Sequence, residues 1–266
     1  MMPKVTYVVN TYNREDKLYQ ALDSIVSQNY SKISIIVVDD CSACNLEEQV
    51  LTKYSSIDLK YIRNDRNLGL AKSRQIGLNA VDSEFVAFLD DDDVLVDANK
   101  TQRHVSILQE KINVSVVCSD IIEKHKDHEV EKNIQWPSNL TNHMLFRNGI
   151  IYPSTTTARK SMLINVGGFD CKFKRGIDSD LYRRLIFSGY EIYHEASKVV
   201  LYLVDADDKI TDHITVKGVA KNVSSNFRTL IKYPKEFINS PRALIYRLRV
   251  VVFGIAKFAL YSVRLK

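Results

Sequence analysis

Residues 85–93 read Phe-Val-Ala-Phe-Leu-Asp-Asp-Asp-Asp, an apolar run that passes directly into four consecutive aspartates. The apolar part has the length and the side chains of a strand that is covered on both faces of a sheet. One aspartate after a strand is commonly a turn residue or a helix cap. Four in succession exceed what a turn needs, so they indicate a binding site rather than a turn alone.

The rest of the first half alternates between strand-like and helix-like periodicity. Strand-like runs cover residues 5–9, 34–38, 59–62, 85–89 and 114–118, and helical patterns cover residues 18–26, 70–80 and 98–111. Such alternation predicts an α/β fold with a mostly parallel sheet flanked by helices. Ligands of these sheets bind beyond the carboxyl ends of the strands. Residues 11–14 and the pair Asp39-Asp40 follow the first two strands, so we expect them beside the aspartates.

Composition and charge limit the kinds of partner. Of the 266 residues, 45% are apolar and 26% are charged, which is ordinary for a folded protein. The net charge is +5, but residues 242–266 hold six basic residues and no acidic one, which leaves −1 for the first 241. We therefore expect no nucleic-acid partner for the body of the protein. No secretory signal pattern opens the chain, and its four scattered cysteines suit a reducing cytoplasm.

The four aspartates are more informative because the sequence lacks the usual phosphate-binding motifs. Neither G-x-G-x-x-G nor G-x-x-x-x-G-K-[ST] occurs, so both common backbone cradles for phosphate are missing. Carboxylates repel a diphosphate: a like-charge pair about 4 Å apart costs roughly 4 kcal/mol at an effective dielectric near 20. A divalent cation between carboxylate and phosphate reverses that sign, and Mg²⁺ or Mn²⁺ prefers oxygen ligands. The sequence therefore predicts phosphate bound through Mn²⁺ or Mg²⁺.

Five motifs in order carry a family resemblance. They are VTYVVNTYNR at 5–14, IVVDDCS at 36–42, NLGLAKSRQIG at 67–77, FLDDDD at 88–93, and GGFD at 167–170 followed by IDSDLYRR at 177–184. Together they resemble family 2 glycosyltransferases of the GT-A fold, from about residue 5 to residue 211. The resemblance implies a Rossmann-like GT-A domain at 1–215, with a nucleotide-sugar half at 1–120 and an acceptor half at 121–215. Residues 216–266 would form a helical C-terminal region.

The same resemblance implies the roles of single residues on the donor side. Thr11, Tyr12 and Asp40 would hold the nucleotide base, and Asp39 would support their loop. Asp90 would contact the ribose, and Asp92 would bind the metal. The full set implied for the donor and its metal is Thr11, Tyr12, Arg14, Asp39, Asp40, Arg74, Asp90, Asp91 and Asp92. For Arg74, an ordinary surface arginine on a helix is the competing interpretation.

Asp178 matches the aspartate that the family uses as general base toward the acceptor hydroxyl. The alternatives are a helix N-cap at Asp178 and a base at Asp180 instead. Ile177 departs from the family, which has an acid there. Many relatives also carry a histidine near the end of the domain as a metal ligand. Here Asp207 is the candidate substitute, with His213 less suited to the role.

The C-terminal segment has the pattern of an amphipathic helix. Its apolar residues at helical spacing are Leu244, Leu248, Val251, Val252, Ile255 and Ala259, and its basic stripe is Arg242, Arg249, Lys257 and Arg264. The uncharged run at 250–256 is far shorter than the ~20 residues that span a bilayer. Residues 242–266 are therefore predicted to contact an anionic membrane surface peripherally. Packing against the catalytic domain and an oligomer contact remain as alternatives.

The resulting functional prediction is an inverting, metal-dependent glycosyltransferase at the inner face of the cell membrane. Its donor would be a nucleotide-sugar, with UDP preferred, and its acceptor a lipid-linked or growing saccharide of O-antigen or capsule type. Two alternatives stay open. Asp90-x-Asp92-x-Val94 also fits an aspartyl-phosphate phosphatase, in which Asp90 would be the nucleophile. The other is a non-catalytic membrane scaffold that keeps only a nucleotide-sugar pocket.

Overall fold

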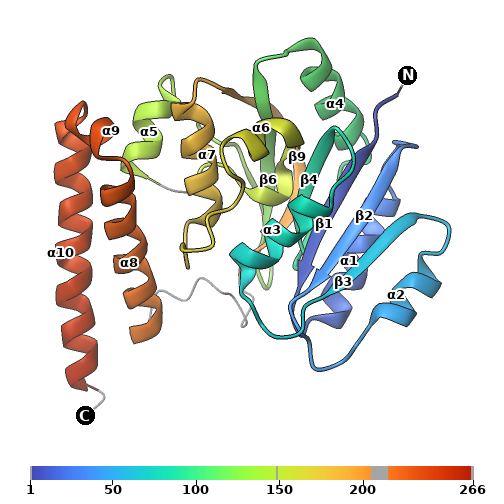
Figure 1. Ribbon diagram of the computed structural model, residues 1–266, viewed down its shortest axis with the longest axis horizontal. Coiled ribbons are helices and arrows are strands. Elements are labelled where there is room, and N and C mark those ends of the chain that lie inside the picture. Colours follow the sequence, from blue (N-terminus) through green and yellow to red (C-terminus); the bar gives the residue numbers. More distant parts are fainter. Residues whose placement is uncertain (1, 148, 205–214, 265–266) are drawn as a thin grey trace.

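The computed structural model describes residues 2–147, 149–204 and 215–264 (Figure 1). Within these residues a nine-stranded sheet has the order β3-β2-β1-β4-β8-β6-β9-β5, with β7 paired to β6. Its first half is parallel, as predicted, and consists of β1 (Val5–Thr11), β2 (Ile33–Asp39), β3 (Asp58–Arg63) and β4 (Phe85–Asp90). The carboxyl ends of β1, β2 and β4 therefore meet at one edge.

The second half of the sheet is mixed rather than parallel. The short β8 (Thr157–Arg159) runs antiparallel to β4 and to β6 (Val114–Lys124), so it reverses the direction of the sheet between them. β9 (Glu191–Leu203) is parallel to β6 and antiparallel to β5 (Asp93–Leu95). The charged residues after β6 form a hairpin with β7 (Glu129–Lys132). The pairing of β9 with β6 contains register shifts, the first between Val114 and Val116 of β6.

Alternating side chains divide the core between the two faces of the sheet. Val5, Tyr7 and Val9 of β1 pack with α1 (Glu15–Val26), α2 (Glu47–Lys53) and α4 (Lys100–Glu110). Val8 faces the other way, toward a core that includes residues of α3 (Leu70–Ala80), α5 (Leu140–Phe146), α6 (Lys160–Asn165) and α7 (Ile177–Phe187). The contact of α3 is close, because a Cβ on Gly77 would lie 2.4 Å from Val8 Cγ1.

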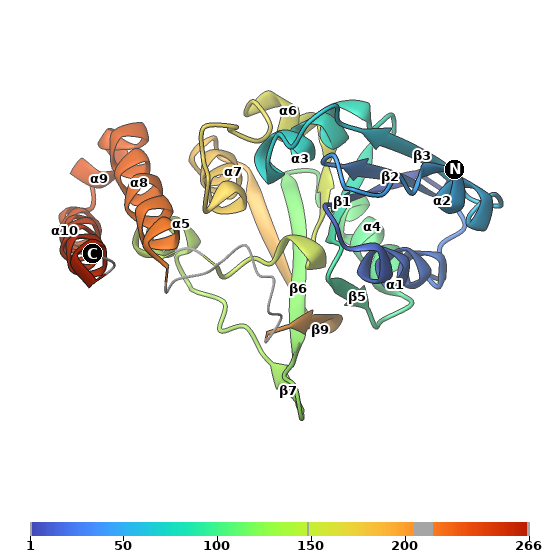
Figure 2. The same ribbon diagram turned by 90° about the horizontal axis from the view of Figure 1, so that it is seen from below.

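The C-terminal region forms a helical hairpin of α8 (Val216–Lys232), α9 (Pro234–Ile238) and α10 (Pro241–Arg264). Figures 1 and 2 place it at one end of the molecule, with β2, β3 and α2 at the other. One face of α10 packs inward through Ala243, Arg247 and Val251. For that face, the alternative of packing against the rest of the protein is correct. Leu248 and Val252 are exposed on the other. In the described part of the chain, no helix is both long enough and apolar enough to cross a bilayer.

Candidate functional site

The site lies where β1, β2 and β4 end and α7 begins. The chain turns sharply after β1 and β2, where Asn13 and Cys41 adopt positive φ angles of 54° and 68°. Such angles are uncommon for residues other than glycine and often occur at functional sites. The two turns are tied together, because Asn13 N donates to Ser42 Oγ (2.8 Å) and Ala43 N donates to Asn13 Oδ1 (2.7 Å).

The four aspartates have different surroundings. Asp90 and Asp92 keep 31% and 18% of their side chains exposed, whereas Asp91 and Asp93 are buried. Arg14 Nη1 donates to Asp91 Oδ1 (2.9 Å) and to Asp92 Oδ2 (3.1 Å). Asp93 accepts from the Ser154 hydroxyl, which also accepts from Asp90 N (3.1 Å). The loop is therefore fixed from both sides, with Asp90 and Asp92 facing outward.

Two of the clustered carboxylates, those of Asp91 and Asp92, have raised pKa values. Burial raises the pKa of Asp91 to about 6, against the opposing effects of Arg14 and the Thr11 hydroxyl. Burial and the neighbouring Asp90 raise the pKa of Asp92, and Arg14 partly offsets the rise. A cation near Asp92 would relieve both the desolvation and the repulsion. The electrostatics thus favour a positively charged ligand at this loop.

Arg74 of α3 joins the acidic loop to α7. Its guanidinium donates to Asp90 Oδ1 through Nη2 and to Asp178 Oδ1 through Nη1. Only 2% of the Arg74 side chain is exposed, so the interpretation as a surface arginine is wrong. A buried arginine with two carboxylate partners holds both in defined positions, because its planar fork has fixed donor directions.

Asp178 and Asp180 differ sharply in accessibility. Asp178 has 23% of its side chain exposed beside Arg74. Asp180 is fully buried, and its carboxylate accepts from Tyr233 Oη (2.6 Å), Arg184 Nε (2.9 Å) and Lys232 Nζ (3.0 Å). Asp180 is thereby committed to holding α7 against the C-terminal hairpin, and Asp178 is the carboxylate that faces the site.

The alternative that Asp178 is the N-cap of α7 is wrong. The N-cap is Gly176, which adopts the left-handed conformation with φ of 66°, and Asp178 lies inside the first turn. A glycine suits this position because a side chain would be strained there. The carboxylate of Asp178 is consequently not used as a cap.

Asp39 and Asp40 both brace loops of the site. Asp39 is fully buried and accepts from Ser42 N (2.8 Å), Ser42 Oγ (2.5 Å) and Arg63 Nη1 (2.6 Å). Asp40 Oδ1 accepts from Asn64 Nδ2 (2.9 Å) and Leu68 N (2.7 Å), and Asp40 Oδ2 accepts from Gly69 N (2.7 Å).

A carboxylate oxygen can accept two hydrogen bonds, so Oδ2 of Asp40 has room for one further donor. The predicted contact of Asp40 with a nucleotide base stays a prediction. Thr11 is buried at the end of β1, whereas Tyr12 is 46% exposed at the rim. That exposure leaves the Tyr12 ring available for stacking.

A metal at Asp92 fits the oxygen chemistry of the loop. Among residues 2–147, 149–204 and 215–264, no group of three or more His, Cys, Asp or Glu side chains is arranged to hold a metal ion. A metal bound at Asp92 could also take ligands from a diphosphate and from water, as Mg²⁺ commonly does. The further candidates Asp207 and His213 lie outside the described residues.

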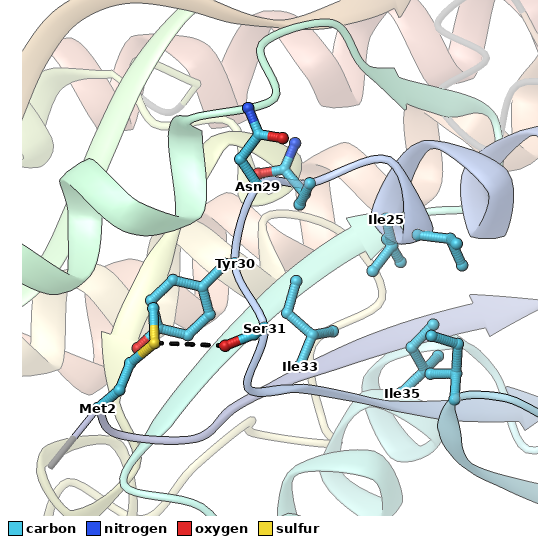
Figure 3. Close-up of a pocket in the computed structure, with 10 residues that line it drawn as sticks. Met2, Ile25, Asn29, Tyr30, Ser31, Ile33 and Ile35 are labelled. Atoms are coloured by element: carbon cyan, nitrogen blue, oxygen red, sulfur yellow. Dashed lines mark hydrogen bonds between the residues drawn. The ribbon is translucent and has the colours of Figure 1, made fainter.

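A separate hollow of about 500 Å³ lies at the opposite, amino end of the first strands. Ile25, Tyr30, Ile33 and Ile35 line it together with Met2, whose sulfur accepts from Ser31 Oγ (Figure 3). The lining is mostly apolar and contains no acidic or basic side chain. It offers no charged side chain to a phosphate or a metal, so the site at the carboxyl ends remains the candidate.

Three residues that brace the site were not predicted from the sequence. Arg63, Asn64 and Ser154 hold Asp39, Asp40 and the aspartate loop respectively. Arg63 and Asn64 come at the end of β3, so the same strand-end reasoning applied to that strand would have found them. Ser154 lies in a 3-10 turn at 153–155 with no periodic pattern, and nothing in the sequence marks it.

This fold and this arrangement are those of a GT-A glycosyltransferase. Residues 6–180 match the family model for glycosyl transferase family 2, and the chain belongs to that family. The family assignment decides against the aspartyl-phosphate phosphatase.

Relatives of known name extend the comparison. An uncharacterized glycosyltransferase of Haemophilus influenzae is 26% identical over 91% of this chain and 88% of its own. The Escherichia coli UDP-Glc:α-D-GlcNAc-diphosphoundecaprenol β-1,3-glucosyltransferase WfgD is 28% identical over 54% of this chain and 55% of its own. The mannosyltransferase PcManGT of Pyrobaculum calidifontis, solved with GDP-Man and Mn²⁺, superposes with a TM-score of 0.68 at 18% identity, over 99% of this chain and 76% of its own.

Proposed function

We propose that the protein is an inverting glycosyltransferase that uses a divalent metal, with Asp178 as its general base. The observation that carries this proposal is the buried Arg74, which holds Asp178 beside Asp90 of the acidic loop. It sets a proton acceptor next to the carboxylate expected at the donor. Inversion requires such an acceptor facing the sugar from the side opposite to the departing diphosphate.

Asp178 has the environment of a general base. Burial raises the pKa of its carboxyl above the usual value, with Arg74 opposing and Asp90 adding to the rise. A higher pKa makes the carboxylate a better proton acceptor, and the proton transfers as the acceptor hydroxyl attacks the anomeric carbon. Arg74 keeps the carboxylate ionised and correctly placed before the acceptor arrives.

On the donor side, we assign some residues to the nucleotide and others to the metal. Tyr12 and Asp40 would hold the base, Asp90 the ribose, and Asp92 the metal on the diphosphate. A bound Mn²⁺ or Mg²⁺ supplies Lewis-acid stabilisation of the charge that develops on the leaving diphosphate. Arg14 already spans Asp91 and Asp92, so it holds both carboxylates in place before the donor binds.

The substrates are proposed from the relatives. WfgD uses, by its name, UDP-Glc and a diphosphoundecaprenol-linked sugar. We propose for this chain a UDP-sugar donor and a lipid-linked or growing saccharide of bacterial surface polysaccharide. Such an acceptor lies at a membrane, so the enzyme would work at its inner face, with residues 242–266 as the peripheral contact.

Substitution Asp178→Asn tests the proposal directly. The variant is nearly isosteric and keeps a hydrogen-bond acceptor for Arg74, but it cannot take a proton. We expect turnover to fall by about 10²–10⁴-fold, the usual range for a general base, with donor binding retained, measured by product formation and by calorimetry. Unchanged turnover would remove Asp178 from the mechanism. A wild-type protein that binds donor but never turns over would instead be the scaffold.

The stereochemical part is tested on the product. NMR coupling constants of the new linkage should show the configuration opposite to that of the donor sugar. Retention of the donor configuration would contradict a single displacement assisted by Asp178.

A further inference from the structure

The C-terminal hairpin differs in charge from the rest of the molecule. Residues 216–266 contain eleven Lys and Arg and one acidic residue, Glu236, which gives them +10. Because the whole chain carries +5, residues 1–215 carry −5. The protein is thus strongly dipolar, and its positive end is the hairpin that Figures 1 and 2 place farthest from β3 and α2. A positive end of this kind is attracted to an anionic surface.

The outer face of α10 is apolar where a solvated helix would be polar. Ala243, Arg247 and Val251 point inward, one or two turns apart. On the other side the exposed apolar residues, from 46% to 72% accessible, are Ile245, Leu248, Val252, Phe253 and Ile255. Val251 belongs to the apolar series of the predicted amphipathic helix, but its small remaining exposure (8%) puts it on the inner face.

Basic side chains border this apolar face. Arg242, Arg249 and Lys257 are seven and eight residues apart, which places them along one line of the helix. An apolar stripe with a basic border is the pattern of a helix that lies in the plane of a membrane interface. Arg247 does not belong to that border, since its guanidinium is buried and donates to Leu145 O (2.7 Å) and Asn226 Oδ1 (2.6 Å).

A groove between α8 and α10 opens beside the basic border. Its volume is about 490 Å³, and it is lined by Asn222, Tyr246, Arg249, Val250, Phe253, Gly254 and Lys257. The two helices touch at its base, where a Cβ on Gly254 would lie 2.5 Å from Val223 Cγ2. Two cations, an amide and two aromatic rings around an apolar base suit an ionic headgroup that continues into a hydrocarbon chain.

From this arrangement we propose that the α8–α10 groove binds the phosphate headgroups of anionic phospholipids, while the outer face of α10 enters the bilayer interface. Arg249 and Lys257 contact the phosphates, and Leu248 and Val252 contact the acyl chains. This inference rests on the proposed action on a lipid-linked acceptor. It also orients the enzyme: α7, which carries Asp178, lies between the hairpin and the nucleotide half, and its Asp180 is bonded to Lys232 and Tyr233 of the hairpin segment.

The test is sedimentation of the full chain with vesicles of phosphatidylcholine, with or without phosphatidylglycerol. We expect wild type to bind the anionic vesicles. The double variant Arg249→Gln, Lys257→Gln should partition about thirtyfold more weakly, because each basic residue near an anionic surface raises the partition coefficient by about fivefold to sixfold. The matched control is Lys221→Gln, Lys235→Gln, which removes the same charge at exposed positions outside the groove. Its partition should change less than about threefold.

Other outcomes would overturn the proposal. Equal loss in both double variants would reduce the effect to net charge and remove the groove site. If the double variant Leu248→Ser, Val252→Ser bound vesicles as well as wild type, the outer face of α10 would not enter the bilayer. If light scattering showed a wild-type dimer that this variant abolishes, the face would instead be a contact between two copies of the chain. Nucleotide titration of the same variants separates this inference from the transferase proposal, because the donor residues proposed above lie outside the hairpin and their binding of nucleotide should be unaffected.

Discussion

At the scale of single residues, Arg74 is a buried charge that depends on two ion-pair partners. Its guanidinium pairs with carboxylates from two different elements, and both are needed to offset the cost of burying the charge. Neither partner was predicted: the sequence showed an arginine on a helix near the donor, and the contact with Asp178 spans 104 positions. Contacts of this range depend on how α3 and α7 pack, which residue spacing does not encode.

Substitution of Arg74 should change the pH dependence of the reaction. Arg74 lowers the pKa of Asp178 against the effect of burial, so its loss leaves that pKa higher. A general base works only when it is deprotonated, and therefore the acid limb of kcat/KM in Arg74→Gln should move to higher pH, with Arg74→Lys between variant and wild type. An unshifted limb would show that Arg74 acts on stability alone. Lys72→Gln, an exposed change on the same helix, is the control.

Other residues of the site were within reach of the sequence. The aspartate loop, the Asp39-Asp40 pair and residues 11–14 all come together at one edge, because parallel strands bring their carboxyl ends together. What they touch was not predictable. Asp40 accepts a hydrogen bond from Gly69 N at the start of α3, and Asp180 accepts one from Tyr233 of the hairpin.

At the scale of elements, the strongly periodic segments were predicted and the short ones were not. β1 to β4, α3 and α4 follow the alternation of the sequence closely. The missed elements include α2, α5 and α6, each six or seven residues long. A segment this short has too few turns or alternations to show a period, so its structure is decided by what it packs against.

The close packing of α3 on the sheet gives a prediction about stability. Gly77→Ala would place a methyl group 2.4 Å from Val8 Cγ1 and 3.3 Å from Val38 Cγ2. Strain of this kind should lower the free energy of unfolding by about 1–3 kcal/mol, measured by urea denaturation. Asn79→Ala, exposed on the same helix, serves as the control. A Gly77→Ala protein as stable as wild type would mean that α3 lies farther from β1.

A second element-scale prediction concerns α4. His104 is fully buried between Thr157 Oγ1 (3.1 Å) and Ser119 Oγ (2.9 Å), and burial lowers its pKa to about 4. In the unfolded chain His104 has the higher pKa and takes up a proton more readily than in the folded protein. The stability that comes from burying the neutral imidazole is therefore complete above pH 6.5 and is lost as the pH falls toward 4.

The size of the effect is up to about 3 kcal/mol over that range. Urea denaturation at several pH values should therefore show a steeper acid-side loss of stability in wild type than in His104→Gln. The difference between the two proteins isolates His104 from carboxylates that titrate in the same window. Parallel curves would indicate that His104 takes up its proton without unfolding.

At the scale of the whole molecule, charge and architecture point the same way. The negative body holds the acidic loop, at which the proposed diphosphate would need a cation, whereas the positive hairpin suits an anionic lipid surface. The hairpin is fastened to α7 through Asp180, so the helix that carries the proposed base is bonded directly to the proposed membrane contact. The sequence predicted the basic tail but not this attachment, which depends on Lys232 and Tyr233 outside the predicted segment.

The central claim is that the acidic loop binds a nucleotide through a metal, and a calorimetric titration tests it most directly. UDP, GDP and dTDP are titrated into wild type and Asp92→Ala, with Mn²⁺ and with EDTA. We expect UDP to bind wild type with Mn²⁺, and to bind neither in EDTA nor to Asp92→Ala. UDP binding of equal affinity in EDTA, or no binding of any nucleotide with Mn²⁺, would contradict a metal-dependent donor site at this loop.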